Sequence, residues 1–201
     1  MDFTNAKANL EKLGYTVSCF DTAKEAAEYL DSSIDKTSVG IGGSLTIEQM
    51  GLYDKLVSHN RVFWHWRVPE GSSPADVCKE AAGADIYLSS VNGLSETGEI
   101  INIDGNGNRV AAAIYGHRKV YFILGENKLA ETFDKALHRA RNIAAPLNAQ
   151  RLKRNTPCAA KADRCYNCQS PERICRALSV LWTKPYSAEY EVVLIHENLG
   201  Y

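Results

Sequence analysis

The chain has 201 residues, with 23 Lys and Arg against 24 Asp and Glu, so its formal net charge is -1. This balance gives no global positive field and argues against nucleic acid as a partner. Hydrophobic residues make up 45% and charged residues 23% of the chain, which excludes a disordered protein. The length favours a single globular domain over residues 1–201.

Features of targeting are absent from the sequence. No apolar run approaches the roughly 18 residues of a membrane span. The polar N-terminus, MDFTNAKANLEKLGY, lacks the basic and then apolar order of a signal peptide. We therefore expect a cytoplasmic protein with no membrane partner. In that reducing compartment, cysteines serve as free thiols or metal ligands more often than as disulfides.

Helical and strand-like segments alternate along the chain. Apolar residues at three- and four-residue spacing predict helices at residues 2–13, 21–30, 46–58, 74–82, 109–115 and 128–144. Short β-branched or aromatic runs predict strands at residues 15–20, 37–41, 61–66, 85–91, 99–104, 119–124, 177–183 and 190–196. Asp21 is the expected N-cap of the second helix. The alternation is typical of an α/β fold with a mostly parallel sheet flanked by helices.

A glycine-rich turn follows the strand at 37–41. Gly42 and Gly43 let the backbone approach a ligand closely, and Ser44 and Thr46 add hydroxyl groups. The turn lies at the carboxyl end of a strand, where α/β sheets bind ligands, so it predicts an anion- or cofactor-binding loop. A tight turn with a Ser or Thr N-cap is the alternative, because the spacing matches neither a P-loop nor G-x-G-x-x-G.

Three further positions follow strands in the same way. Asn92 begins the loop NGLSETGE, in which Glu96 is the candidate catalytic residue, placed beside Ser44 as a base, a nucleophile or a sugar-hydroxyl acceptor. Arg109 and Lys128 each stand at an expected helix start and are candidates to contact an anionic ligand. A solvated turn glutamate and an ordinary surface lysine are the alternatives for Glu96 and Lys128.

The most specific local pattern is a set of four cysteines in the basic segment 145–176. Cys158, Cys165, Cys168 and Cys175 have the spacing C-x6-C-x2-C-x6-C. Such thiolates can hold a tetrahedral Zn²⁺ or a four-iron, four-sulfide cluster. We favour the iron–sulfur cluster over zinc, because structural zinc commonly uses two paired knuckles and the outer cysteines here are single. Thiol redox chemistry at Cys165 and Cys168 is a third reading, which gives the outer pair no role.

Several stretches together resemble the LUD-domain (lactate utilisation) family. They are GIGGSLTIEQMG at 40–51, NGLSETGEIINIDGNGNRVAAAIYGHRKVYFILGENK at 92–128, RARNIAAPLNAQRLKRNTPC at 139–158, and HENLGY at the C-terminus. The resemblance implies a fold like ribose-5-phosphate isomerases and CoA-transferases. It also implies that residues 42–46 hold phosphate or acyl-carrier groups while an acidic residue, here matched by Glu96, does chemistry.

The resemblance leaves several functions open. Some family members are implicated in oxidising L-lactate to pyruvate beside partner subunits that carry iron–sulfur clusters. This chain would then be a component or a stand-alone relative of such a system, with a small organic acid as its ligand. The alternatives are a CoA-transferase or sugar-phosphate isomerase type of enzyme, which takes a phosphate- or CoA-bearing ligand, and a non-catalytic metabolite-binding module with structural zinc.

Overall fold

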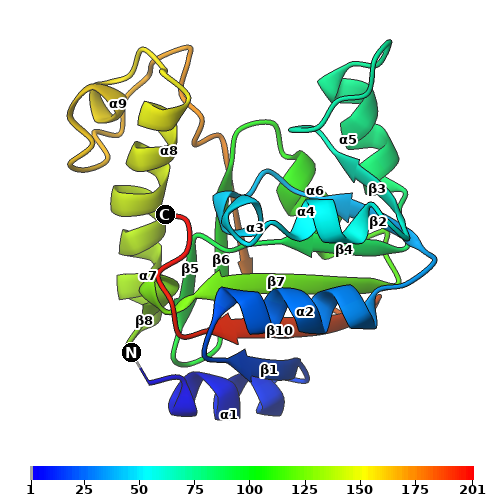
Figure 1. Cartoon of the computed structure of the whole chain (residues 1–201). Helices are drawn as coiled ribbons and strands as arrows, with labels where there is room; N and C mark the ends of the chain where they lie inside the picture. Colours follow the sequence, from blue (N-terminus) through cyan, green and yellow to red (C-terminus); the bar gives the residue numbers. More distant parts are fainter. Residues whose placement is uncertain (1) are drawn as a thin grey trace.

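The computed structural model describes residues 2–201, which form an α/β fold around a six-stranded sheet (Figure 1). All strand pairs in this sheet are parallel. The strand order is β1 (Thr16–Phe20), β10 (Glu189–Ile195), β7 (Lys119–Gly125), β4 (Ile86–Ser89), β2 (Ser38–Ile41) and β3 (Arg61–Trp64). The expected mostly parallel sheet flanked by helices is confirmed.

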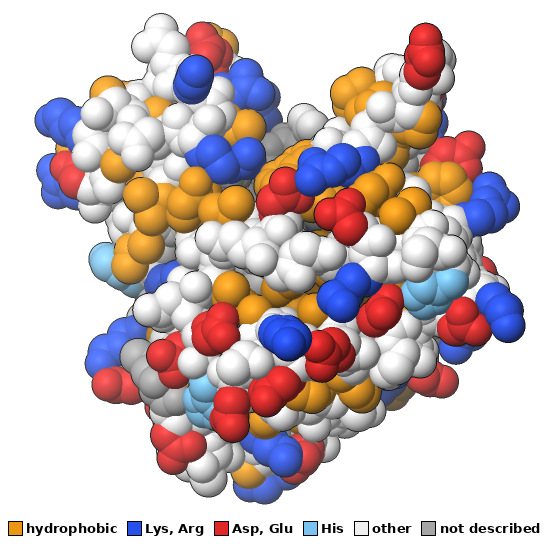
Figure 2. Space-filling model, in the orientation of Figure 1, with side chains coloured by type: hydrophobic (Ala, Val, Ile, Leu, Met, Phe, Trp, Pro, Cys, Tyr) orange, Lys and Arg blue, Asp and Glu red, His pale blue; other side chains and the backbone are white. Residues whose placement is uncertain are grey.

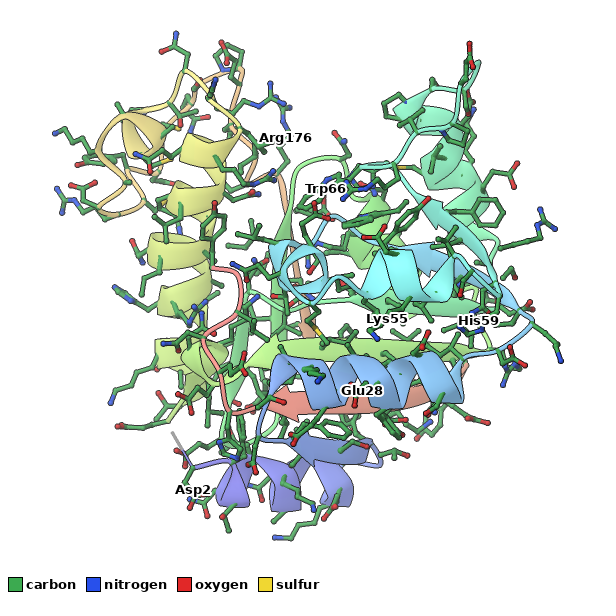
Figure 3. The ribbon with its side chains drawn as sticks, viewed as in Figure 1. Asp2, Glu28, Lys55, His59, Trp66 and Arg176 are labelled. Atoms are coloured by element: carbon green, nitrogen blue, oxygen red, sulfur yellow. The ribbon has the colours of Figure 1, made fainter. Side chains whose placement is uncertain are left out.

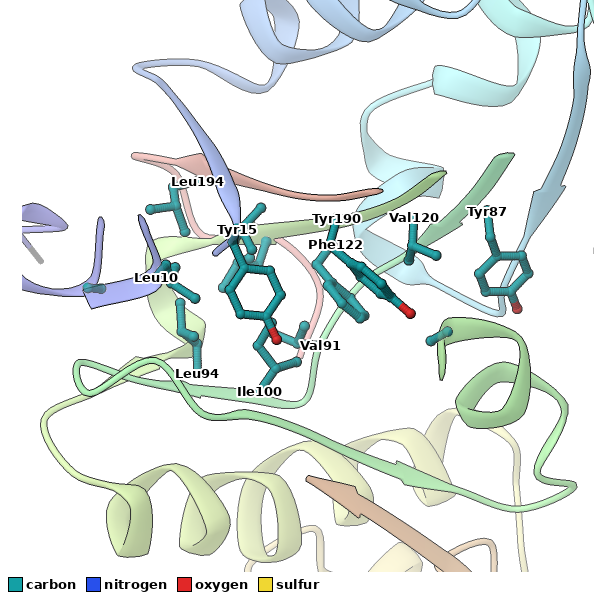
Figure 4. Packing of buried hydrophobic residues seen from close by; sticks show 14 of the residues in the cluster. Leu10, Tyr15, Tyr87, Val91, Leu94, Ile100, Val120, Phe122, Tyr190 and Leu194 are labelled. Carbon is teal, nitrogen blue, oxygen red and sulfur yellow. The ribbon is translucent and has the colours of Figure 1, made fainter. Parts of the chain in front are cut away.

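Helices cover both faces of the sheet because its central strands are apolar on both sides. In β7, Val120, Phe122 and Leu124 enter one core while Tyr121 and Ile123 enter the other. The first core includes residues from α1 (Thr4–Lys12), α5 (Pro74–Ala82) and α6 (Asn108–Ile114), and Figure 4 shows its aromatic centre. The second includes residues from α2 (Ala23–Ser33), α3 (Leu45–Gln49) and α4 (Leu52–Leu56).

A second, smaller sheet lies beside the first. Its order is β8 (Leu129–Ala130), β5 (Gly93–Ser95), β6 (Ile100–Asp104) and β9 (Ala177–Leu181), and β6 pairs antiparallel with both neighbours. The sheet packs against α7 (Phe133–Arg139) through Ile101 and Ala136. The sequence prediction missed β5 and β8, because strands of three and two residues carry no readable alternation and depend on long-range pairing.

Several predicted helix boundaries were wrong. The segment 46–58 forms two short helices that break at Gly51, whose φ of 61° lies in the left-handed region. Thr22 caps α2 instead of Asp21, because its hydroxyl accepts from the Glu25 amide in a complete capping box. Lys128 starts no α-helix: it ends a 3₁₀ turn (Glu126–Lys128), and Thr132 caps α7.

The helix beyond α7 continues further than predicted. A π-helical segment (Ala140–Ala144) leads directly into α8 (Ala145–Arg151), so the helical path passes Pro146 and the segment 145–176 begins as helix. Pro146 is tolerated in the first turn of α8, where its missing N–H interrupts no regular α-helical bond. A short α9 (Pro157–Lys161) follows. No helix in the span 2–201 is both long and apolar enough to cross a membrane.

Candidate functional site

A cavity of about 320 Å³ lies at the carboxyl ends of the main strands, a volume suited to a small molecule. Loops after β2, β3 and β4, the loop between β6 and α6, and α8 all contribute to its wall. Figure 2 shows the notch between the α8–α9 lobe and the α5 lobe, and Figure 3 marks Trp66 and Arg176 near it. Its polar lining residues are Ser44, His65, Ser90, Asn92, Asp104, Asn106, Asn108, Arg109, Lys128, Asn148, Arg151, Arg154 and Tyr201.

Only two of the four candidate residues in the glycine-rich turn line the cavity. Gly43 and Ser44 line the cavity, whereas Gly42 and Thr46 lie behind it. A Cβ on Gly42 would stand 2.9 Å from Arg109 Cγ, so glycine is required for this loop to approach the arginine. The Ser44 hydroxyl accepts from the Ile47 amide at 3.3 Å, which fixes the entry into α3 and leaves its proton free to donate.

Arg109 is a fixed positive charge in the wall. Its Nη1 donates to the Ser90 and Asn102 oxygens, and its Nη2 donates to Asn92 Oδ1 and to the Ile103 carbonyl. Asp104 stands 3.8 Å from Nε. With its terminal N–H groups engaged, Arg109 contributes its field to an anionic ligand more than it contributes hydrogen bonds.

Lys128 is buried in the same wall, with 4% of its surface exposed. Its Nζ donates to Thr46 Oγ1 and to Ser90 Oγ, each at 2.9 Å. No carboxylate lies within ion-pair distance of it among residues 2–201. Burial first, and then the Arg139 and Arg109 charges, hold the pKa of Lys128 well below its usual range.

Glu96 does not lie beside Ser44, so its predicted placement was wrong. Its Oε2 accepts from Asn5 Nδ2 at 3.1 Å, and its carbonyl accepts from Asn9 Nδ2 at 2.8 Å. It is absent from the cavity wall. The physical reason is that β5 belongs to the second sheet, where its loop packs against α1 instead of following the main strands. The catalytic role of Glu96 stays a prediction without support from the cavity.

His65, Trp66, Arg151 and Arg154 are among the wall residues that the sequence-based site prediction missed. His65 and Trp66 follow β3, and burial lowers the pKa of His65, which keeps its ring neutral. The Arg151 guanidinium lies 4.8 Å from the Trp66 ring centre and donates to Asn148 Oδ1, whereas the Arg154 guanidinium donates to no group in residues 2–201. The carboxyl-end rule applied to β3 would have found His65 and Trp66.

The four cysteines of the C-x6-C-x2-C-x6-C pattern all line a second cavity. Its wall also contains Arg141, Arg173 and Thr156. Two of its residues, Ala145 and Ile174, line the first cavity as well, so the two cavities share a wall. All four thiols are free, and Cys19 and Cys78 lie elsewhere.

Arginines and amide groups surround these thiols. Arg173 Nη2 donates to Cys175 Sγ and the Asn167 amide donates to Cys165 Sγ, both at 3.3 Å. Although burial raises the pKa of the Cys165 thiol, the Asn167 amide and the Arg141 guanidinium outweigh it and lower that pKa. Arg173 Nε is buried without a hydrogen-bond partner in the described chain. Within residues 2–201, no group of three or more His, Cys, Asp or Glu is arranged to hold a metal ion.

Comparison with known proteins identifies the family. The sequence model of the LUD domain matches residues 3–195, nearly the whole chain. This chain belongs to the LUD-domain family. A crystal structure of a DUF162 family protein from Deinococcus radiodurans is similar to this LUD domain with a TM-score of 0.54 and 12% sequence identity. The match covers 97% of this chain and 99% of that one, and at this identity it shows the fold alone.

No curated protein matches this LUD-domain sequence. The sequence model establishes the family and the structural similarity establishes the fold, whereas the chemistry has to be argued from the two cavities of this LUD domain.

Proposed function

We propose that this LUD-domain protein is a component of an organic-acid oxidation system, with L-lactate as its ligand and pyruvate as the product. The small acid would occupy the 320 Å³ cavity, and the four cysteines would hold a four-iron, four-sulfide cluster. The observation that carries the proposal is that Ala145 and Ile174 line both cavities, which are therefore neighbours. Such closeness suits electron transfer from one to the other.

The charge of the first cavity supports an anionic ligand. Arg109, Arg151 and Arg154 bring positive charge to its wall, in which Lys128 also lies, while Asp104 is the one carboxylate side chain among the described wall residues. Because Asp104 accepts hydrogen bonds from the Asn106, Gly107 and Val110 amides, it is committed to its own loop. The net field therefore favours a carboxylate or phosphate group.

The second cavity offers four thiolates to a bound group, but its free volume is about 10 Å³ as the thiols stand, so the cysteine segment would have to move outward to hold a cluster. Cys158, Cys165, Cys168 and Cys175 would be its ligands, and a cubane cluster does not need four sulfurs to converge on one atom, because each thiolate binds a different iron. When bound, the cluster would carry single electrons. Arg141 and Arg173 offset the negative charge of four thiolates, and the unpartnered Arg173 Nε is a donor available to a sulfur.

The electron balance implies a partner. Oxidation of a 2-hydroxy acid to a 2-oxo acid releases two electrons and two protons, whereas one cluster carries one electron at a time. The partner subunit would therefore have to supply a two-electron acceptor that takes the C–H hydrogen as hydride, with the iron–sulfur clusters passing electrons on singly and the hydroxyl proton going to solvent. The CoA-transferase alternative that uses Glu96 loses support, because Glu96 lies outside the cavity wall.

Metal analysis of protein purified or reconstituted without oxygen tests the proposal. We expect about four irons and four sulfides per chain and an absorption band near about 400 nm. Cys168→Ala should lose both, and Cys19→Ala, whose thiol lies on β1 away from the cavity, should keep both. Colourless protein that holds one zinc would contradict an electron-transfer role.

A further inference from the structure

Lys128 is a charged side chain placed where the protein gives it no negative partner. It is 4% exposed, and it lines the ligand cavity from the turn after β7. Its two hydrogen-bond partners, Thr46 Oγ1 and Ser90 Oγ, are hydroxyl groups that can donate or accept. They can therefore hold the amine in either its protonated or its neutral form.

The groups that face Lys128 from the packed elements are mostly positive. Arg109 on α6 and Arg139 on α7 both repel a charge on Lys128. Arg139 is held by the Asn127 and Asn92 carbonyls, at 2.6 and 2.7 Å. The C-terminal Gly200 and Tyr201 also line the wall, and a Cβ at Gly200 would lie 3.1 Å from Lys128 Nζ. Elsewhere in the wall, neutral His65 follows β3, and Asp104 is engaged by amides and by Arg109. Burial without a counter-ion favours the neutral amine in the empty cavity.

An anion in the cavity reverses this preference. A carboxylate or phosphate beside Nζ supplies the counter-charge that the protein lacks, and it also screens Lys128 from the two arginines. The third hydrogen-bonding position of Nζ, which neither Thr46 nor Ser90 occupies, is then available to the ligand oxygen. Binding and protonation of Lys128 are thus thermodynamically linked.

We propose that Lys128 is the anion-recognising residue of this cavity and that it takes up a proton as a small carboxylate or phosphate ligand binds. The proposal rests on the anionic-ligand part of the proposed function and names the group that recognises it. It needs neither the cluster nor turnover.

Titration calorimetry in buffers of different ionisation enthalpy measures the proton uptake. With L-lactate, and separately with inorganic phosphate, at neutral pH we expect close to one proton taken up per ligand bound. Lys128→Met should lose most of the affinity. Lys128→Arg keeps a charge without a titratable amine, so any binding it retains should proceed without uptake. Lys119→Arg is the matched control, because Lys119 is already paired with Glu191 at 2.8 Å.

NMR of the lysine ¹³Cε resonances reads the charge directly. The Lys128 resonance is the one that is missing from the spectrum of Lys128→Arg. Without ligand at neutral pH, it should have the chemical shift of a neutral amine. On adding anion, it should move to the chemical shift of an ammonium group. Binding without proton uptake, an ammonium signal in the free protein, or failure of both anions to bind would overturn the proposal. Absence of iron with proton uptake intact would instead contradict only the cluster part of the proposed function.

Discussion

Asn92 connects the charged groups of the cavity. Its Oδ1 accepts from Arg109 Nη2 and from the Ile103 amide, at 3.1 and 2.8 Å, while its carbonyl accepts from Arg139 Nη1. One residue thereby holds two arginines close to Lys128 and ties the first sheet to the second. The positive field of the cavity is consequently fixed before any ligand arrives, which reduces the ordering cost of binding.

Lys128 should lower the stability of the protein in the absence of ligand. Its pKa is depressed in the folded chain, so near neutral pH the unfolded chain binds more protons and the free energy of unfolding rises with pH. The slope reaches about 1.4 kcal/mol per pH unit when the folded amine is fully neutral. The rise ends as pH passes the ordinary lysine value of 10.5.

Urea unfolding of wild type and Lys128→Met between neutral pH and about pH 10 measures this contribution of Lys128 to the free energy of unfolding. We expect Lys128→Met to be the more stable at neutral pH, with the difference shrinking as pH rises. Lys119→Met should behave in the opposite sense, because it leaves the buried Glu191 carboxylate without its ammonium partner. A difference between wild type and Lys128→Met that does not change with pH would show that Lys128 is charged in the folded protein.

At the scale of elements, the π-helical segment sets the direction of α8. It lies between α7 and α8 and contains five residues, Ala140–Ala144. Ala144 and Ala145 face the ligand cavity, and Ala145 also faces the four-cysteine cavity. The extra residue of a π-turn rotates everything after it by about 100° relative to a continuous α-helix. This element therefore decides which face of α8 becomes the shared wall.

Deletion of Ile143 tests the role of this turn. Ile143 is 44% exposed, so its removal empties no core, but it should convert the segment to regular α-helix and turn Arg151 away from the cavity. We expect the far-ultraviolet circular dichroism to change little, while anion affinity falls at least about tenfold, equal to about 1.4 kcal/mol. Ile143→Ala, which keeps the residue count, should bind as wild type does. Equal affinity in the deletion variant would show that α8 direction is unimportant.

The sequence predicted most of the residues that meet at the first cavity, and it misplaced Glu96 for a physical reason. Gly43, Ser44, Asn92, Arg109 and Lys128 meet at one cavity, because they follow strands or begin helices at one edge of a sheet. Local sequence predicts such positions well. Glu96 follows β5, whose place in a second sheet depends on pairing with β6 and β8, and no local pattern encodes that pairing.

In the whole molecule, the two sheets position different parts of the two cavities. The main sheet, covered on both faces, fixes the loops that carry the glycine turn, His65 and Lys128. The second sheet anchors the cysteine segment, because β9 starts two residues after Cys175 and pairs along β6. The first cavity thus lies between the loops of the main sheet and a wall, at Ala145 and Ile174, that it shares with the cavity lined by the four thiols. The cysteine spacing predicted that the four thiols gather, but the sequence could not place them beside the first cavity.

Hyperfine spectroscopy can show whether the ligand and the cluster lie on the two sides of the shared wall. Electron–nuclear double resonance of the reduced, reconstituted protein with ¹³C-carboxylate L-lactate reports whether the ligand lies beside the cluster. We predict a ¹³C coupling that disappears in Lys128→Met, in which the cluster signal itself is retained. A normal cluster signal without ¹³C coupling, at lactate concentrations that calorimetry shows to be saturating, would show that the ligand does not bind beside the cluster.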